Sequence, residues 1–473
     1  MKSTLFGVLA FSVAVAGNLH AAATITIVNN DGPGEGFNDP AARAPIGNNP
    51  GTTLGQQRLN AFNHVASLWG QWITSTVPIA IRAQFDPQTC GAGGAVLGSA
   101  GTININRDDP SFPFAATWFH AALANKLAGV DLVPANPEIN ATFNSALDTG
   151  CLPGTTGWYY GLDGAAPVGT TDLVPVLMHE MAHGLGFSTF VNTGTGANNG
   201  GFTDIFSRHA FDLDANLFWN QMNDAQRQAS AINSRKLVWD GPSVTGNIAF
   251  LAFGTPELAI TAPAPLAGLY DIGAASFGPT YPAAPGGLPG NVVLAVDGTA
   301  PTSDACEPIT NTAAMAGNIC LVDRGTCGFA IKVKACQVAG AIGALVADNV
   351  AGTPPPGMTG VDPTITIPSG RITLTLGNSI KAALPGVAVR LQADMTQRAG
   401  AEPTNTKVFL NAPNPLVPGS SVSHWDPITF PNTLMEPAIN ADLQYRPDLT
   451  ENQFEDIGWG PVTPAVLKEF KIE

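Results

Sequence analysis

Residues 172–187 read DLVPVLMHEMAHGLGF, and this stretch determines how the rest of the chain is interpreted. The apolar run before the histidines predicts a helix. Asp172 can cap this helix at its start, and Pro175 falls in its first turn, where a missing N–H costs little. We expect Gly184 and Gly186 to end the helix, because glycine readily adopts the left-handed conformation that closes one.

The spacing His179-Glu180-x-x-His183 within this predicted helix indicates a metal site. Histidines four residues apart lie on one helix face, so both imidazoles can bind a single Zn²⁺. Glu180 is turned about 100° away from His179, toward the open side of the metal. There it can act as general base toward a zinc-activated water that attacks a peptide carbonyl. The motif therefore predicts a zinc-dependent hydrolase of peptide bonds.

A catalytic zinc site needs a third protein ligand, which the motif does not supply. No glutamate occurs between His183 and Phe250, and Thr189 stands where the longer pattern H-E-x-x-H-x-x-G-x-x-H would place a histidine. The histidine candidates that remain beyond residue 23 are His64, His120, His209 and His424. The carboxylate alternatives are Asp204, Asp212 and Asp214.

Two short patterns near the C-terminus favour one of these histidines. His424 stands in the sequence SHWD, and Met435 follows eleven residues later in NTLMEP. A histidine followed by a methionine in a tight turn is typical of metzincins, in which the methionine packs beneath the metal ligands. Considered alone, Met435 would be an ordinary core residue. For His64, His120 and His209 we expect ordinary surface or hydrogen-bonded roles.

Together these residues resemble the leishmanolysin-like (gametolysin-like) branch of the metzincins, in which a long insertion precedes the third histidine. The first motif is matched by His179, Glu180, His183, Gly186 and Phe187, and the second by His424-Trp425 and Leu434-Met435. The resemblance covers roughly residues 24–255 and 397–460. It implies one catalytic Zn²⁺ with the ligands His179, His183 and His424, the general base Glu180 and the Met-turn residue Met435.

The segment between the two motifs looks like a protease-associated (PA) domain. The resemblance rests on ICLVDRGTCGF at residues 319–329, on Lys332 and on Ala339-Gly340-Ala341. A strand, a helix closed by Gly340 and a second strand are predicted here, which is a β-α-β unit. By resemblance such a domain is non-catalytic and either covers access to an active site or binds substrate and partner segments. For Arg324 we expect a structural role in a turn.

Six cysteines are present, and in an exported chain they can pair. Four of them are crowded into the PA-like segment and favour two local bridges, namely Cys306, Cys320, Cys327 and Cys336. Cys90 and Cys151 are left for a third. Our hypothesis pairs Cys306 with Cys320 and Cys327 with Cys336, while two other arrangements of the same four residues stay open.

The start of the chain is typical of a signal peptide. Lys2 is followed by the apolar residues 5–16 and by a small-residue cleavage site at Ala21-Ala22-Ala23. No later segment has about 18 apolar residues without a polar break, so no membrane anchor is expected. Charged residues make up 12% of the chain and the net charge is -15, which disfavours nucleic acid as a partner. We expect an exported protein, secreted or periplasmic.

Local patterns place further elements around the predicted zinc helix. Residues 24–30 and 77–85 alternate as strands, and residues 56–73 show helical spacing between them. Residues 449–457 are expected to form a late helix. The aromatic residues Trp158-Tyr159-Tyr160 are expected to pack or to form a wall of the cleft.

The expected fold class is α+β, with a metzincin-like zincin catalytic domain and an inserted, β-rich PA domain. The catalytic domain would combine a twisted mixed sheet, the zinc helix and a C-terminal Met-turn subdomain. The expected boundaries are 1–23 for the signal peptide, 24–255 and 397–473 for the two catalytic parts, and 256–396 for the insertion.

The predicted function is that of a secreted zinc metalloendopeptidase acting on proteins or peptides. Two alternatives stay open. One is an aspzincin-like peptidase with an aspartate as third ligand, and the other is a PA-domain binding protein in which zinc is only structural. Intact Glu180 argues against a structural site, which has no need of a general base.

Overall fold

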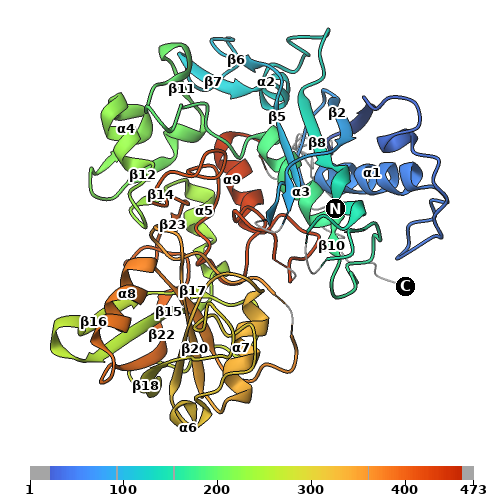
Figure 1. Cartoon of the computed structure of the whole chain (residues 1–473). Coiled ribbons are helices and arrows are strands. Elements are labelled where there is room, and N and C mark those ends of the chain that lie inside the picture. The colour runs from blue at the N-terminus through green and yellow to red at the C-terminus, as the bar shows by residue number, and fades with distance from the viewer. Residues whose placement is uncertain (1–21, 92–93, 153–154, 361, 441, 461–473) are drawn as a thin grey trace, which may run out of the picture.

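The computed structural model describes residues 22–91, 94–152, 155–360, 362–440 and 442–460. The predicted signal peptide, residues 1–23, lies outside these ranges except for its last two residues. In Figure 1 an eight-stranded sheet with its helices forms the lower part of the molecule, and the remaining elements form the upper part. No helix in the described ranges is long and apolar enough to cross a bilayer.

A four-stranded sheet and two helices make up the N-terminal half of the upper part. The strands run in the order β1 (Ile25–Asn29), β2 (Ile79–Asp86), β8 (Ile139–Asn144) and β5 (Gly98–Thr102). The first three are parallel and β5 is antiparallel to β8. Side chains of β2 alternate between buried and half-buried. The buried face packs against α1 (Leu54–Trp72) and α3 (Leu173–Leu185), which also contact each other. The predicted strand-helix-strand opening is therefore observed.

Helix α3 begins as predicted and is closed by the second of its two glycines. The Asp172 carboxylate accepts a hydrogen bond from the Val174 N–H, and Gly186 closes the helix with a φ of 143°. The prediction that Gly184 also ends the helix is wrong, because Gly184 lies inside it. A Cβ atom at Gly184 would lie 2.5 Å from Cγ2 of Ile139 on β8. Glycine is needed there for close packing of helix on sheet.

Small sheets and short helices complete the upper part. Strands β6 (Ile105–Asn106), β7 (Thr117–His120) and β11 (Thr203–Asp204) form one sheet, and β12 (Ala210–Asp212), β13 (Leu217–Phe218), β14 (Leu237–Trp239) and β23 (Val408–Phe409) form another. Two-stranded pairs join β3 (Cys90–Gly91) with β4 (Gly94–Ala95) and β9 (Trp158–Tyr159) with β10 (Thr171–Asp172). The helices are α2 (Ala121–Ala128), α4 (Asp224–Ser230), α5 (Pro242–Gly246) and α9 (Leu449–Ile457).

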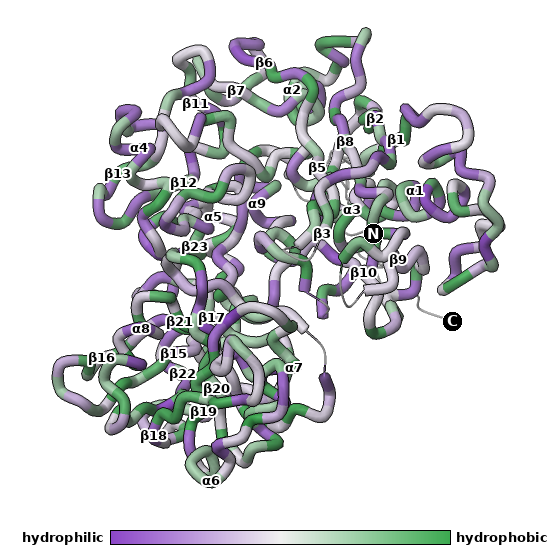
Figure 2. Tube along the Cα trace, viewed as in Figure 1, coloured by the Kyte–Doolittle hydropathy of each residue, from purple (hydrophilic) through white to green (hydrophobic). Residues whose placement is uncertain are grey.

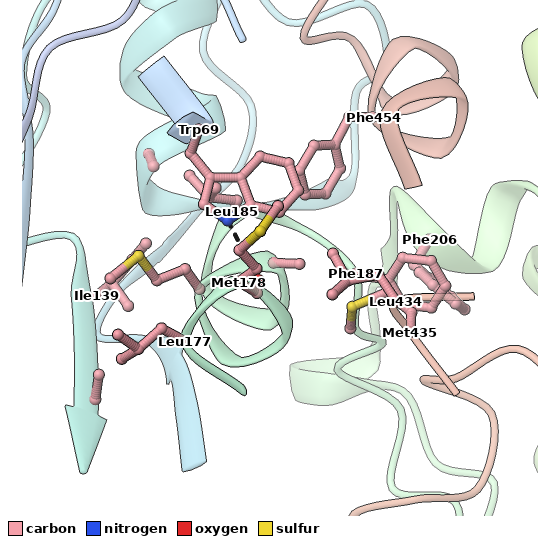
Figure 3. Close-up of a cluster of buried hydrophobic side chains, with 14 of the residues drawn as sticks. Trp69, Ile139, Leu177, Met178, Leu185, Phe187, Phe206, Leu434, Met435 and Phe454 are labelled. Carbon is pink, nitrogen blue, oxygen red and sulfur yellow. Dashed lines mark hydrogen bonds between the residues drawn. The ribbon is translucent and has the colours of Figure 1, made fainter. Parts of the chain in front are cut away.

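The chain segments on either side of the lower sheet share one core. Strand β23, which follows that sheet in the sequence, pairs with β14, which precedes it. A single cluster of buried apolar residues contains side chains from before residue 252 and from after residue 400. In Figure 3, Leu434 and Met435 from the late segment lie beside Phe187 and Phe206 from the early one. The upper part is therefore one body built from two separated stretches of chain.

The lower part is an eight-stranded mixed sheet with helices on both faces. The strand order is β16 (Gly268–Asp271), β15 (Phe253–Ala262), β22 (Ala388–Arg398), β18 (Leu288–Leu294), β19 (Ile319–Asp323), β20 (Gly343–Ala347), β21 (Ser369–Ile372) and β17 (Gly273–Ala274). Its helices are α6 (Thr312–Met315), α7 (Phe329–Val338) and α8 (Leu374–Ala383). The predicted β-α-β unit is β19-α7-β20. Figure 2 shows hydrophobic residues along β19 and β20, which are buried on both faces.

Three disulfides are formed, and the pairing predicted within the PA-like segment is wrong. Cys90 bonds Cys151 as expected, but Cys306 bonds Cys327 and Cys320 bonds Cys336. Cys320 on β19 and Cys336 on α7 belong to the same buried cluster between sheet and helix, which brings their sulfur atoms together. Cys327 precedes α7 in a surface loop and reaches the loop of Cys306 instead. Three disulfides are typical of proteins that fold in an oxidising compartment.

Candidate metal centre

Three histidines gather where α3 meets the segment after the lower sheet. Nε2 of His179 lies 3.2 Å from Nε2 of His183 and 3.2 Å from Nε2 of His424, although His179 and His424 are 245 residues apart. His179 and His424 are each 5% exposed, and His183 is half-buried. These are the three histidines that the sequence patterns singled out, and their nitrogen atoms are close enough to hold one metal ion.

The other ring nitrogen of each histidine is held by a backbone carbonyl. Nδ1 of His179 donates to Leu434 O at 2.7 Å, Nδ1 of His183 to Phe187 O at 2.8 Å, and Nδ1 of His424 to Ser420 O at 2.8 Å. A carbonyl can only accept a hydrogen bond, so the proton belongs on Nδ1 and the Nε2 lone pair is free. All three free lone pairs therefore point into the same small space.

Electrostatics also favours neutral imidazoles at this place. Burial, with a smaller contribution from the neighbouring His183, lowers the pKa of His179 to about 3, and burial lowers the pKa of His183 to about 4. Burial is the main reason that the pKa of His424 also lies far below its ordinary value. Neutral imidazole is the form that binds a metal ion.

The spacing fits zinc. In a tetrahedral site with Zn–N bonds of about 2.05 Å, two ligand nitrogens lie about 3.3 Å apart. The observed Nε2–Nε2 distances of 3.2 Å agree with that value. Three converging lone pairs repel one another, and a shared cation relieves that repulsion. The donor set and its geometry thus suit a Zn²⁺ ion with its fourth position open.

Glu180 follows the first histidine and turns toward β5. A Cβ atom at Gly98 of β5 would lie 3.3 Å from Cγ of Glu180, so the carboxylate chain passes along this strand. The pKa of Glu180 is raised to about 7, because the effect of burial exceeds the opposite effect of a hydrogen bond from the Ala100 backbone. The residue is half-buried, directly follows His179 in the chain and lies on the helix that packs against β5. It is therefore placed to exchange protons near neutral pH.

The turn that carries Met435 supports the first histidine through its backbone. Leu434 accepts the Nδ1–H of His179 through its carbonyl, and its own N–H donates to Asp448 Oδ2 at 2.6 Å. Asp448 therefore fixes the peptide that orients His179. It was missed at the sequence level, although its place directly before the predicted helix at 449–457 is a signal for a helix cap.

Met435 links the same turn to the third histidine. Its side chain is fully buried, and its carbonyl accepts the Trp425 N–H at 2.8 Å. Trp425 follows His424 directly in the chain. The turn at 434–435 is therefore hydrogen-bonded both to the ring of His179 and to the backbone next to His424.

The three aspartates proposed as alternative ligands have other partners. The Asp204 carboxylate accepts hydrogen bonds from the Thr189 hydroxyl, the Phe190 N–H and the Ser207 N–H. Asp212 accepts from Ser230, and Asp214 lies 3.5 Å from Lys236. Over the described ranges, the group that forms around His179 and His183 is completed by His424 and contains none of the aspartates.

The remaining histidines of the described ranges have other partners. His120 is fully buried, and its Nε2 lies 2.8 Å from the Ser188 hydroxyl. His209 stacks on Trp239 with ring centroids 5.1 Å apart. His64 is half-buried beside Tyr445.

The aromatic run before α3 packs in the core. Trp158, Tyr159 and Tyr160 are 3–6% exposed. Nε1 of Trp158 donates to the Asn144 carbonyl, and the Tyr160 hydroxyl donates to Asp148. Of the two roles expected for these residues, packing is the one observed.

Comparison with known proteins identifies the lower part of the molecule. Residues 288–380 match the PA domain family. Vacuolar-sorting receptor 1 from Pisum sativum is 33% identical over 138 residues, which are 28% of this chain and 22% of that protein. The chain therefore matches less than a quarter of the length of this curated relative.

The solved structures with similarity to this chain include two peptidases, each matched over part of its chain. The zinc aminopeptidase BSAP from Bacillus subtilis aligns with a TM-score of 0.24 and 19% identity, over 33% of this chain and 36% of that one. The subtilisin-like protease Apa1 from the Antarctic psychrotroph Pseudoalteromonas sp. AS-11 aligns with a TM-score of 0.22 and 25% identity, over 31% and 34%. Such low scores carry no argument about the histidine site. The family match is the firm result, and the chain contains a PA domain over residues 288–380.

Proposed function

We propose that this protein is an exported zinc metalloendopeptidase that hydrolyses peptide bonds of proteins or peptides. The observation that carries the proposal is the convergence of three unprotonated Nε2 atoms, from His179, His183 and His424, at the helix that also carries Glu180. Three histidines with an open fourth position are the ligand set of a catalytic zinc site, whereas a structural site fills all four positions with protein ligands. For this reason we prefer an enzyme over a binding protein with structural zinc.

A zinc ion held by these histidines would polarise the substrate carbonyl and make an attacking water more acidic. Glu180 would then act as the general base, which means that its carboxylate would take a proton from the attacking water. Its pKa of about 7, raised by burial, also lets it keep that proton and deliver it to the leaving amine. The carbonyls of Leu434, Phe187 and Ser420 fix the tautomer and the orientation of the three rings throughout.

Strand β5 offers a place for an extended substrate. In the described part of the chain it pairs with β8 on one side, and its other edge is left unpaired next to α3. A peptide that adds to this edge as a further strand is held by backbone hydrogen bonds on both sides of Glu180. Such binding does not require a free chain end, which favours cleavage of internal bonds.

The finer family assignment is part of the same proposal. We assign the upper part of the molecule to the leishmanolysin-like metzincins, with Met435 as the Met-turn residue and with catalytic segments at 24–255 and 397–473. The PA domain would then be an insertion at 256–396. Support comes from the shared core of the two segments and from the burial of Met435 directly after Leu434, whose carbonyl holds His179.

Export is proposed from two independent features. Residues 1–23 have the composition of a signal peptide, and three disulfides require an oxidising compartment such as the periplasm or the outside of the cell.

The test compares the wild type with Glu180→Gln for zinc content and for cleavage of an unfolded protein and of a peptide blocked at its N-terminus. We expect about one zinc per chain in both proteins, and internal cleavage by the wild type that is about 10²- to 10⁴-fold slower in the variant. Glu257→Gln, a substitution on β15 of the lower sheet, is the matched control and should leave both readouts unchanged. Zinc-loaded wild type that cleaves neither substrate would favour the binding protein. Cleavage restricted to peptides with a free N-terminus would contradict the endopeptidase assignment.

A further inference from the structure

We propose that Asp297, Asp304 and Glu307 of the PA domain form a binding site for a hard divalent cation, with calcium as its occupant. The three residues lie in the loop between β18 and α6, and one carboxylate oxygen of each lies within 4.8 Å of the others. This loop is fastened to the start of α7 by the Cys306–Cys327 disulfide. The site is separate from the histidine centre, and the inference does not depend on the proposed peptidase function.

Burial without a partner is the observation that points to a missing ion. Asp297 is 3% exposed and Asp304 is 2% exposed, so both carboxylates are withdrawn from water. Oδ2 of Asp304 is buried and has no hydrogen-bond partner among the described residues, while its Oδ1 accepts a bond of 3.2 Å from the Cys306 N–H. Buried carboxylates are costly unless they are paired or coordinate a metal ion.

Nearby hydrogen bonds and ion pairs do not supply a positively charged partner for these buried carboxylates. The Asp297 carboxylate accepts the N–H groups of Thr299 and Ala305, which are neutral donors. The ion pairs observed for this domain involve other acids, namely Asp271, Asp323 and Asp348.

One buried cation lies beside the cluster and sets its charge balance. Lys332 on α7 is fully buried, and its ammonium donates to the backbone carbonyl of Asp304 at 2.6 Å and lies 3.2 Å from Sγ of Cys306. The pKa of Asp304 lies below its ordinary value. Burial raises it, but hydrogen bonds from the Thr326 side chain and the Cys306 N–H, the charge of Lys332 and a contact with Asp297 lower it more. Three carboxylates and one ammonium leave two negative charges. A single divalent cation neutralises them.

The ligand chemistry selects calcium over zinc. All the candidate ligand atoms are oxygens, which calcium prefers, whereas zinc favours nitrogen and sulfur. Calcium takes six to eight oxygen ligands in a flexible arrangement, and residues 298–302 of the loop are exposed, so water can complete the shell. Magnesium gives up its own water reluctantly and is less suited to a site with two buried carboxylates. Bound calcium would fix the β18–α6 loop against α7.

The experiment uses the full chain, freed of calcium with a calcium-selective chelator and kept loaded with zinc. Calcium is added during calorimetric titration, and the melting temperature is measured with and without it. We expect one site per chain, with a Kd on the order of 0.1–1 mM as in extracellular calcium modules, and a higher melting temperature with calcium. Asp304→Asn and Glu307→Gln should each weaken binding by about tenfold or more, because each removes a charged ligand. Asp362→Asn, which alters a carboxylate bonded to Thr364 elsewhere in the same domain, should bind calcium like the wild type.

Three results would overturn the proposal. The first is a wild type that shows neither heat of binding nor a shift in melting temperature up to about 10 mM calcium, well above the expected Kd. The second is unchanged binding in the two cluster variants, and Glu307→Gln decides this even if Asp304→Asn fails to fold, since Glu307 is half-buried. The third is a higher affinity for magnesium than for calcium, which would contradict the choice of ion.

Discussion

Replacing Glu436 with glutamine should make the protein less sensitive to alkaline pH. Glu436 is 3% exposed and follows Met435 directly. Its carboxyl group accepts hydrogen bonds from the Thr433 N–H at 2.6 Å, the Thr429 hydroxyl at 2.8 Å and the Asn440 amide at 3.0 Å, all of them neutral donors. Burial raises its pKa from 4.5 to about 8 despite these bonds.

The sign and size of the effect follow from that shift. Between pH 4.5 and pH 8 the folded state holds a proton that the unfolded state has released, so stability falls as the pH rises through this window. Integration between the two pKa values gives a loss of about 4 kcal/mol between pH 5 and pH 9. Glutamine cannot ionise and removes this loss. Its amide oxygen can still accept the Thr433 N–H, and any hydrogen bond lost near Asn440 costs about 1 kcal/mol at both pH values.

The assay is urea unfolding at pH 5 and pH 9, followed by tryptophan fluorescence, on wild type and Glu436→Gln. The drop in unfolding free energy between the two pH values should be smaller in the variant by about 4 kcal/mol. Glu402→Gln is the matched control. Glu402 is 4% exposed, and although burial raises its pKa, hydrogen bonds from Thr404 and Thr406 lower it below the ordinary value. Its loss should therefore destabilise the protein at pH 9. An equal drop in wild type and Glu436→Gln would refute the reasoning.

Substitutions at three further sites test packing and cross-linking. Gly184→Ala should lower the free energy of unfolding by about 1–3 kcal/mol, measured in a thermal melt, because its Cβ would press on Ile139. Met435→Ala should cost about 2–5 kcal/mol and Met435→Leu less than about 1.5 kcal/mol in chemical unfolding, with zinc content measured alongside. Joint replacement of Cys90 and Cys151 by serine opens a loop of 61 residues and should cost about 4 kcal/mol, whereas an unchanged midpoint would contradict a bond in solution.

Much of the local structure around α3 could be predicted from the sequence, because it depends on neighbours in the chain. The N-cap at Asp172 and the end at Gly186 are set by local backbone chemistry. The role of Gly184 could not be predicted from local backbone chemistry. Its role depends on the approach of Ile139, which is a tertiary contact.

The same distinction holds for the disulfides and for the candidate site. The partner of Cys320 depends on which face of β19 its side chain takes, and spacing along the chain does not reveal that face. His424 and Met435 were named from their short motifs, and the three histidines do lie together. Their role as zinc ligands stays a prediction. The support that Asp448 gives to the site and the buried carboxyl group of Glu436 were both missed, because burial makes these acids significant and burial is a property of the fold.

The central claim is that His179, His183 and His424 bind one zinc ion. X-ray absorption at the zinc edge, measured on wild type and on His424→Ala, tests it most directly. The account predicts about one zinc per wild-type chain with three imidazole nitrogens at about 2.0–2.1 Å, and a variant that loses either the metal or one of those nitrogens. Zinc bound in the variant with the same affinity and the same number of imidazole ligands would contradict it.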